Sequence, residues 1–206
     1  MRCCTLAIFI LLLVCGAAPT RGVTPDRGRN HQQVERTVAA DPRVVVSACV
    51  VSGDLTIHGW DRKEVHARVS DGVQIELVRV DQTKTSVATE LKLTAIHGRA
   101  GRGSQCLPIG DIELDVPRTA SLKLQSNNGE VRVTEVARVA ATAQSGSITL
   151  AKIHDEVSAT TIGGEITVRD STGSFKLHAT GGSIEVRDLG PATAGDVLDA
   201  STVGGD

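Results

Sequence analysis

The chain has 206 residues, which is enough for one large domain or two small ones. Its formal net charge at pH 7 is −2, with 22 Lys and Arg against 24 Asp and Glu, so no excess of positive charge favours a nucleic acid or an anionic membrane as a partner. Only one Trp and two Phe stand against 21 Gly, a composition that fits a narrow interior with many tight turns.

The first segment has the pattern of a secretory signal peptide. An uncharged run extends from Cys3 to Thr20, and its apolar centre, Leu6–Val14, is too short to favour a membrane span. Small residues follow, so we predict that residues 1–22 form a signal peptide and that the protein is exported to the periplasm, the cell surface or the medium. A lipoprotein signal ending at Cys15 is disfavoured, because Val14 is a poor residue before a lipidated cysteine.

Two cysteines remain after the signal peptide. Cys49 and Cys106 are an even pair in a protein that we expect to be exported, and this favours a disulfide. Two separate thiols are the alternative, since spacing alone does not fix the distance between them.

The next residues have little apolar pattern. Arg, Asn, His and Gln are mixed over 23–42, and we predict a flexible lead-in there. A single β-strand repeat domain is predicted over 43–206.

A first repeat unit surrounds Gly53. Apolar residues alternate before and after it; they are Val46, Ala48, Val50, Leu55 and Ile57. Between Asp61 and Pro117 the strands are longer and have no constant period. We predict antiparallel hairpins in this middle region, which widen or cap the repeat domain.

A regular repeat extends from Leu122 to Asp206. Its glycine anchors, spaced by 17 to 23 residues, are Gly129, Gly146, Gly164, Gly182 and Gly205. Apolar residues stand two and four positions after the first four anchors; they are Val131, Val133, Ile148, Leu150, Ile166, Val168, Ile184 and Val186. Small or apolar residues also stand three, five and seven positions before each anchor.

This pattern predicts an all-β fold. Each unit holds two short strands with period-two alternation, and such a unit must stack on its neighbours to bury its apolar side. We therefore predict a β-solenoid, or β-helix-like stack, with glycine turns that need either a positive φ or close backbone approach. An antiparallel sandwich with regular turns is the alternative.

The last unit ends at Gly204-Gly205-Asp206, where the pattern calls for another apolar strand. We therefore expect the repeat domain to be truncated at its C-terminal end, or to pair there with another molecule. End-to-end or edge-strand self-association would be one form of such pairing.

A regular outward column is the candidate contact surface. It is polar and uncharged, and its members are Gln125, Thr142, Thr160, His178 and Ser201. Such a face suits a glycan or another protein, and a merely soluble strand surface is the alternative.

No residue set predicts catalysis or metal binding. Glu135, Asp170 and Asp188 share a column with Lys152, and we interpret this column as a solvated corner of mixed charge rather than an active site. The histidines lack metal-ligand spacing, and no CxxC or calcium-binding glycine repeat is present. We expect no cofactor.

Several of these motifs together resemble a known family. They are the run Ser52–Asp61, the step Val116-Pro117-Arg118, and the repeats Gly164–Val168 and Gly182–Val186. In order and spacing they are similar to the bacterial adhesin-like family of β-strand repeats, the DUF4097 type, from about Arg43 to the end. The resemblance implies a right-handed β-solenoid-like fold in an exported or envelope-associated protein, and it brings no catalytic residues.

The leading hypothesis is a non-enzymatic exported domain that acts through surface contacts, in adhesion or envelope scaffolding, with a protein or glycan partner. The ectodomain of a regulatory or sensory envelope system is one alternative. A degenerate carbohydrate-active β-helix enzyme is another.

Overall fold

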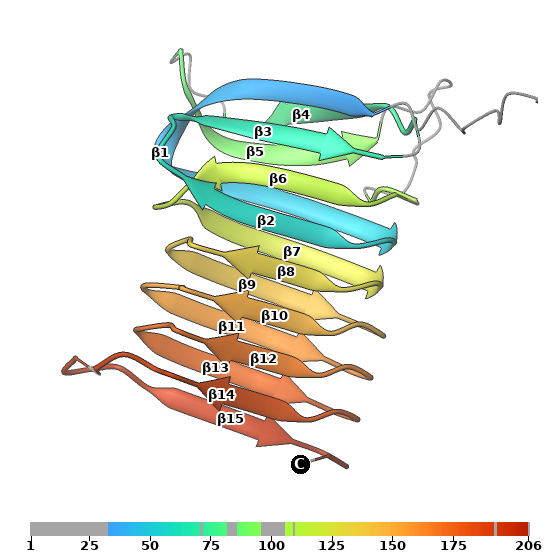
Figure 1. Ribbon diagram of the computed structural model, residues 1–206. Coiled ribbons are helices and arrows are strands. Elements are labelled where there is room, and N and C mark those ends of the chain that lie inside the picture. The colour runs from blue at the N-terminus through green and yellow to red at the C-terminus, as the bar shows by residue number, and fades with distance from the viewer. Residues whose placement is uncertain are drawn as a thin grey trace, which may run out of the picture. The chain divides into compact units, whose positions relative to one another are not determined.

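The computed structural model describes residues 33–70, 72–81, 86–95, 106–108, 110–191 and 193–205, so the predicted signal peptide lies outside the described residues. All regular structure in the described residues is β (Figure 1). The strands are β1 (Val34–Ser52), β2 (Leu55–Trp60), β3 (Glu64–Val69), β4 (Ile75–Arg79), β5 (Ala88–Ala95), β6 (Ile112–Pro117), β7 (Ser121–Asn128), β8 (Val131–Thr134), β9 (Arg138–Ala143), β10 (Ile148–Ala151), β11 (Glu156–Thr161), β12 (Ile166–Arg169), β13 (Ser174–Ala179), β14 (Ile184–Arg187) and β15 (Leu198–Thr202).

The strands form two facing sheets joined through β1. Sheet A contains, in spatial order, residues 34–39 of β1, then β3, β6, β2, β8, β10, β12 and β14. Sheet B contains β4, β5, residues 45–52 of β1, β7, β9, β11, β13 and β15. From β7 onward the chain alternates between the sheets, and from β9 onward each new strand pairs in parallel with the strand two before it (Figure 1). This is the solenoid-like stack that the repeat predicted.

The core lies between the two sheets. Period-two alternation turns one side of each strand inward, so Leu122 and Leu124 of β7 and Val131 and Val133 of β8 are almost fully buried. The inward positions of later repeats are buried in the same way, down to Phe175 in β13. Each repeat thus buries its apolar side only because the next one covers it.

The predicted lead-in over 23–42 is wrong for its last part. Strand β1 already begins at Val34, and residues 34–39 pair antiparallel with β3. Val34 and Ala40 are buried, whereas most of the residues between them are exposed. The polar composition of this segment therefore reflects the solvent side of an ordered strand.

The middle region caps the stack with antiparallel pairs, as the sequence predicted. Strand β3 lies antiparallel between β1 and β6, and β4 lies antiparallel to β5 at the end of sheet B. The order in space differs from the order in sequence. In sheet A, β6 lies beside β2 on the side away from β8, and in sheet B, β5 lies beside the second part of β1 on the side away from β7. The chain must therefore pass the end of β2 on its way from β6 to β7. Arg118 secures this crossing: its backbone N–H donates to the Trp60 carbonyl at 3.1 Å, and its guanidinium pairs with Asp61 at 2.9 Å.

The glycine anchors stand where successive turns touch. A Cβ at Gly164 would lie 2.1 Å from the carbonyl oxygen of Gly146, in the turn before it. Real Cβ atoms do not approach a backbone atom so closely, so this position requires glycine because of the neighbouring turn. The adjacent Gly163 is different, since a Cβ there would lie 3.5 Å from the Gln144 carbonyl oxygen, an ordinary contact.

These two glycines give a matched test of the stacking contact. We expect Gly164→Ala to lower the free energy of unfolding by about 1–3 kcal/mol, the usual cost of overpacking, because the turns must move apart. Gly163→Ala should leave the free energy unchanged or raise it slightly by restricting the unfolded chain. Urea denaturation of both variants measures the difference, and equal stability of the two would contradict the assigned contact.

Candidate contact surface on sheet B

The five predicted contact residues lie side by side on the outer face of sheet B. Parallel pairing places Gln125 beside Thr142, and the series continues through Thr160 and His178 to Ser201. We call this row the central ladder. Neighbouring strands lie about 4.8 Å apart, so its polar groups recur at that interval across five strands.

The central ladder is uncharged and accessible. Gln125, Thr142 and Ser201 are exposed, and Thr160 and His178 are half-buried. His178 Nδ1 lies 2.9 Å from Ser201 Oγ, so these two groups already share a hydrogen bond. The hydroxyl and amide groups can both donate and accept, which suits a ligand that is rich in hydroxyls.

A second row runs parallel to the central ladder, two residues earlier in each strand. Its members, from β5 to β15, are Lys92, Ser47, Lys123, Ala140, Ser158, Lys176 and Asp199. We call it the lysine ladder. In its first part the small residues Ser47 and Ala140 lie on either side of Lys123, and the surface is hollowed there.

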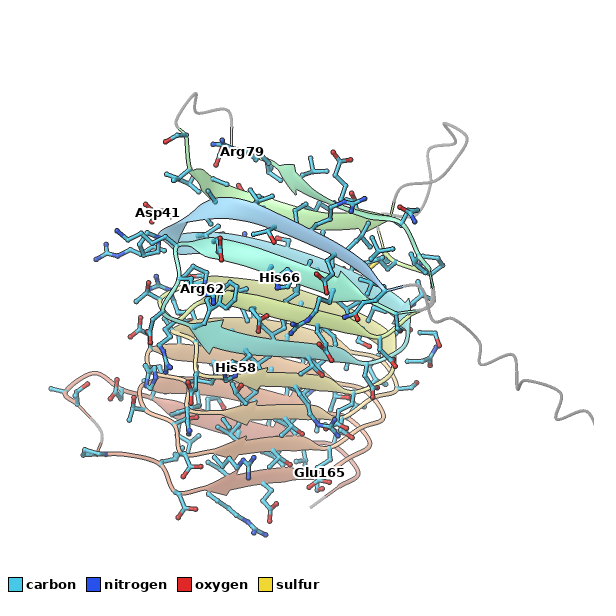
Figure 2. The ribbon with its side chains drawn as sticks, turned by 45° about the horizontal axis from the view of Figure 1, so that its top comes forward. Asp41, His58, Arg62, His66, Arg79 and Glu165 are labelled. Atoms are coloured by element: carbon cyan, nitrogen blue, oxygen red, sulfur yellow. A yellow bond between two sulfur atoms is a disulfide. The ribbon has the colours of Figure 1, made fainter. Side chains whose placement is uncertain are left out.

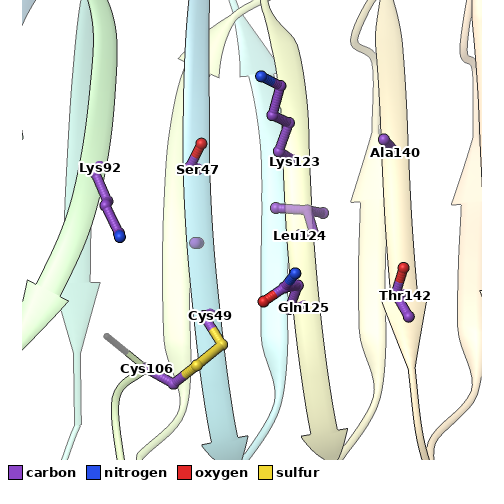
Figure 3. A pocket seen from close by; sticks show the side chains of 10 residues that line it. Ser47, Cys49, Lys92, Cys106, Lys123, Leu124, Gln125, Ala140 and Thr142 are labelled. Atoms are coloured by element: carbon purple, nitrogen blue, oxygen red, sulfur yellow. A yellow bond between two sulfur atoms is a disulfide. The ribbon is translucent and has the colours of Figure 1, made fainter. Parts of the chain in front are cut away.

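The two ladders form the walls and floor of a groove across β5, β1, β7 and β9 (Figure 3). The groove has a volume of about 360 Å³. The polar or charged side chains that line it are Ser47, Lys92, Lys123, Gln125 and Thr142. The disulfide cysteines lie at its edge (Figure 3).

Cys49 and Cys106 form a disulfide, with their Cα atoms 4.4 Å apart. Cys49 occupies the central-ladder position of β1, directly beside Gln125. Leu107 extends this attachment, since its N–H donates to the Cys49 carbonyl and its own carbonyl accepts from the Val51 N–H, both at 2.8 Å. The disulfide therefore fixes Cys106 and Leu107 beside β1 in sheet B, where Leu107 forms a parallel bridge with Val50.

Sequence reasoning found the central ladder but missed the lysine ladder. Lys123 stands two residues before Gln125, as Ser47 stands two before Cys49, so the repeat alignment contained that signal. Lys92 had no such signal, because β5 belongs to the middle region without a constant period.

The predicted corner column lies at the ends of the sheet A strands. Glu135, Lys152, Asp170 and Asp188 all have positive φ, between 51° and 60°. Lys152 Nζ donates to Glu135 at 2.9 Å, and Arg118 pairs with the same carboxylate. The hydrogen bond from Lys152 and the charges of Arg118 and Lys152 hold the pKa of Glu135 below its ordinary value. Glu135 is thus paired with two cations at this corner, and the column carries both signs of charge.

The outer face of sheet A carries side chains that already contact one another. Arg68 pairs with Glu113 at 3.0 Å and with Asp115 at 3.1 Å. The guanidinium of Arg62 lies over the Trp60 ring at 4.8 Å, on the face where Figure 2 shows Arg62, His66 and His58. Within the described residues, no group of three or more His, Cys, Asp or Glu is placed to hold a metal ion.

The disulfide makes a stability prediction. It closes a separation of 57 residues, for which the chain-entropy account gives roughly 4 kcal/mol. We expect the double variant Cys49→Ala/Cys106→Ala to lose about 2–4 kcal/mol in the free energy of unfolding. Urea denaturation with and without dithiothreitol measures this. Reductant should lower the midpoint of the natural protein and leave the double variant unchanged, and a natural protein insensitive to reductant would contradict the disulfide.

Among the described residues, there is no helix of the length and apolar character needed to cross a membrane. A comparison with curated proteins finds no match. A crystal structure described as a candidate cell adhesion protein from Clostridium sporogenes is similar in fold, with a TM-score of 0.51 and 15% identity over 83% of this chain and 100% of that chain. A candidate adhesin from Parabacteroides merdae aligns over 86% of this chain and 95% of its own, with a TM-score of 0.26 and 8% identity. The family described as Toastrack DUF4097 matches residues 44–206, so this chain belongs to that family.

Proposed function

We propose that this protein is a non-enzymatic, exported domain that binds a glycan of the cell envelope, in adhesion or in envelope scaffolding. The central ladder is the observation that carries this proposal. It presents hydroxyl, amide and imidazole groups in register across five strands of one sheet. A sugar polymer offers hydroxyls along its length, which can both donate to and accept from these groups.

The stack favours binding of this kind because its surface is rigid before the ligand arrives. Each residue of the central ladder lies on a strand that pairs with one or two neighbouring strands. In most of these strands, the adjacent residues that point inward are buried. A preorganised surface loses little conformational entropy on binding, so weak polar contacts can add up.

The similar structure from Clostridium sporogenes is described as a candidate cell adhesion protein, and the proposed role agrees with that description. Export is part of the proposal because of the signal-peptide pattern over residues 1–22. Cell fractionation tests it: the protein should leave the cytoplasm, and it should stay there when residues 3–22 are deleted. Cytoplasmic retention of the natural protein would contradict export.

Binding through the central ladder is tested with two matched double variants. Thr142→Ala/Thr160→Ala removes two adjacent hydroxyls from the outer face of sheet B. Thr149→Ala/Thr167→Ala removes two adjacent hydroxyls from the outer face of sheet A and serves as the control. The probe is insoluble bacterial cell-wall sacculi, and co-sedimentation gives the Kd.

We expect the sheet B variant to bind about tenfold more weakly, because two hydrogen bonds of about 0.5–1.5 kcal/mol each are lost. The sheet A control should bind like the natural protein. Equal binding of all three proteins, or a loss confined to the sheet A variant, would contradict the proposal.

A further inference from the structure

The two ends of the stack differ (Figure 1). One end carries the antiparallel cap strands, whereas at the other end β14 and β15 are the outermost strands of sheets A and B. Within the described residues each of these two strands pairs on one side only, β14 with β12 and β15 with β13. An outermost strand presents backbone N–H and C=O groups that can pair with a further strand.

The inward residues of β15 are uncovered. Leu198 and Ala200 stand beside Phe175 and Leu177 of β13, so they occupy the same positions of the repeat. Phe175 and Leu177 are 3% and 2% exposed, whereas Leu198 is 55% exposed and Ala200 is exposed as well. The apolar interior of the stack therefore reaches the surface at this end.

Strand β14 shows the same change. Ile184 and Val186 are half-buried, whereas their partners in β12, Ile166 and Val168, are fully buried. Natural sheet edges are commonly blocked by proline or by charges that point inward. The sequences of β14, Ile-Glu-Val-Arg, and β15, Leu-Asp-Ala-Ser-Thr, contain no proline, and their inward residues are uncharged. Neither device protects these two strands against pairing.

The stagger of the two sheets fits a second copy of the chain. Strands alternate between the sheets and β15 follows β14, so sheet B extends half a repeat beyond sheet A. A two-fold axis parallel to the strands exchanges the two sheets and reverses the stagger. The β15 of a second copy then continues sheet A beside β14, and its β14 continues sheet B beside β15. Because β14 and β15 run in opposite directions, both new pairs are antiparallel, and the contact is isologous.

Charge selects the register of the new pairs. Inward residues must stay inward, so the possible registers differ by two residues. In one register Val186 lies opposite Ala200 of the second copy, and the exposed Arg187 lies opposite the exposed Asp199. A shift of two residues brings Glu185 opposite Asp199 instead. Opposite charges stabilise a directly opposed cross-strand pair and like charges destabilise it, so the first register is favoured.

We propose that two copies of this chain associate end to end, with each β14 paired antiparallel to the β15 of the other copy. The contact covers the inward residues of both strands, and two Arg187–Asp199 pairs set its register. Sheet B of one copy continues as sheet A of the other, so the two central ladders face opposite sides of the dimer. The contact is confined to one repeat, which makes it small for a stable interface, and the dimer therefore dissociates on dilution.

Sedimentation velocity over a wide range of protein concentrations tests the association, and charge reversal tests its register. Arg187→Glu and Asp199→Arg each place like charges opposite one another twice in the dimer, and each should weaken association by about tenfold or more. Arg187→Glu/Asp199→Arg reverses both members of the pair and should restore association. Lys123→Glu changes the net charge as Arg187→Glu does, but it lies four strands from β15 and should associate normally.

A covalent trap gives a second measurement that does not depend on charge. The proposed register sets Glu185 directly opposite Ser201 of the other copy, within reach of a disulfide. Glu185→Cys/Ser201→Cys should therefore form a covalent dimer under mild oxidation. Thr167→Cys/Ser201→Cys moves one cysteine to β12, one strand from the contact, and should stay monomeric.

Three outcomes overturn the inference. One is a monomer at every concentration. Another is a dimer that neither single charge reversal weakens, or that the double reversal fails to restore. The third is the absence of a covalent dimer in Glu185→Cys/Ser201→Cys.

Discussion

The structure depends on backbone contact between successive turns of the chain. At the glycine anchors no side-chain atom separates one turn from the carbonyl oxygen of the turn before it, as at Gly164 and Gly146. This contact fixes how far apart the repeats lie and holds the strands of both sheets in register. The two surface ladders are a consequence: residues at equivalent repeat positions must lie side by side.

This dependence explains what the sequence could predict. The aligned repeats from Gly129 to Gly205 predict the strands, the inward-facing core residues and the central ladder. They do so because the same alternation of apolar and polar residues recurs around each glycine anchor. Other features arise from pairings between distant segments that have no sequence repeat. These are the first part of β1, which pairs with β3, and the positions of β5 beside β1 and of β6 beside β2. Lys92 was missed for that reason, since only the β1–β5 register brings it beside Ser47.

The two outer faces of the stack differ in how their polar groups are used. On sheet A, Arg68 is paired with two carboxylates, and Arg62 lies over Trp60. Those groups largely contact one another within the protein. On sheet B the central ladder is uncharged, and its polar side chains lie in register on neighbouring strands. The contrast favours sheet B as the face of the proposed ligand contact.

The central claim is the proposed ligand contact on the outer face of sheet B, at the central ladder. Backbone amide chemical shifts measured by NMR during titration with soluble fragments of bacterial cell-wall sacculi test this most directly. We expect the largest shifts at Gln125, Thr142 and Thr160, with small changes on the outer face of sheet A at Thr149 and Thr167. Shifts concentrated on sheet A, or spread evenly over both faces, would contradict the account.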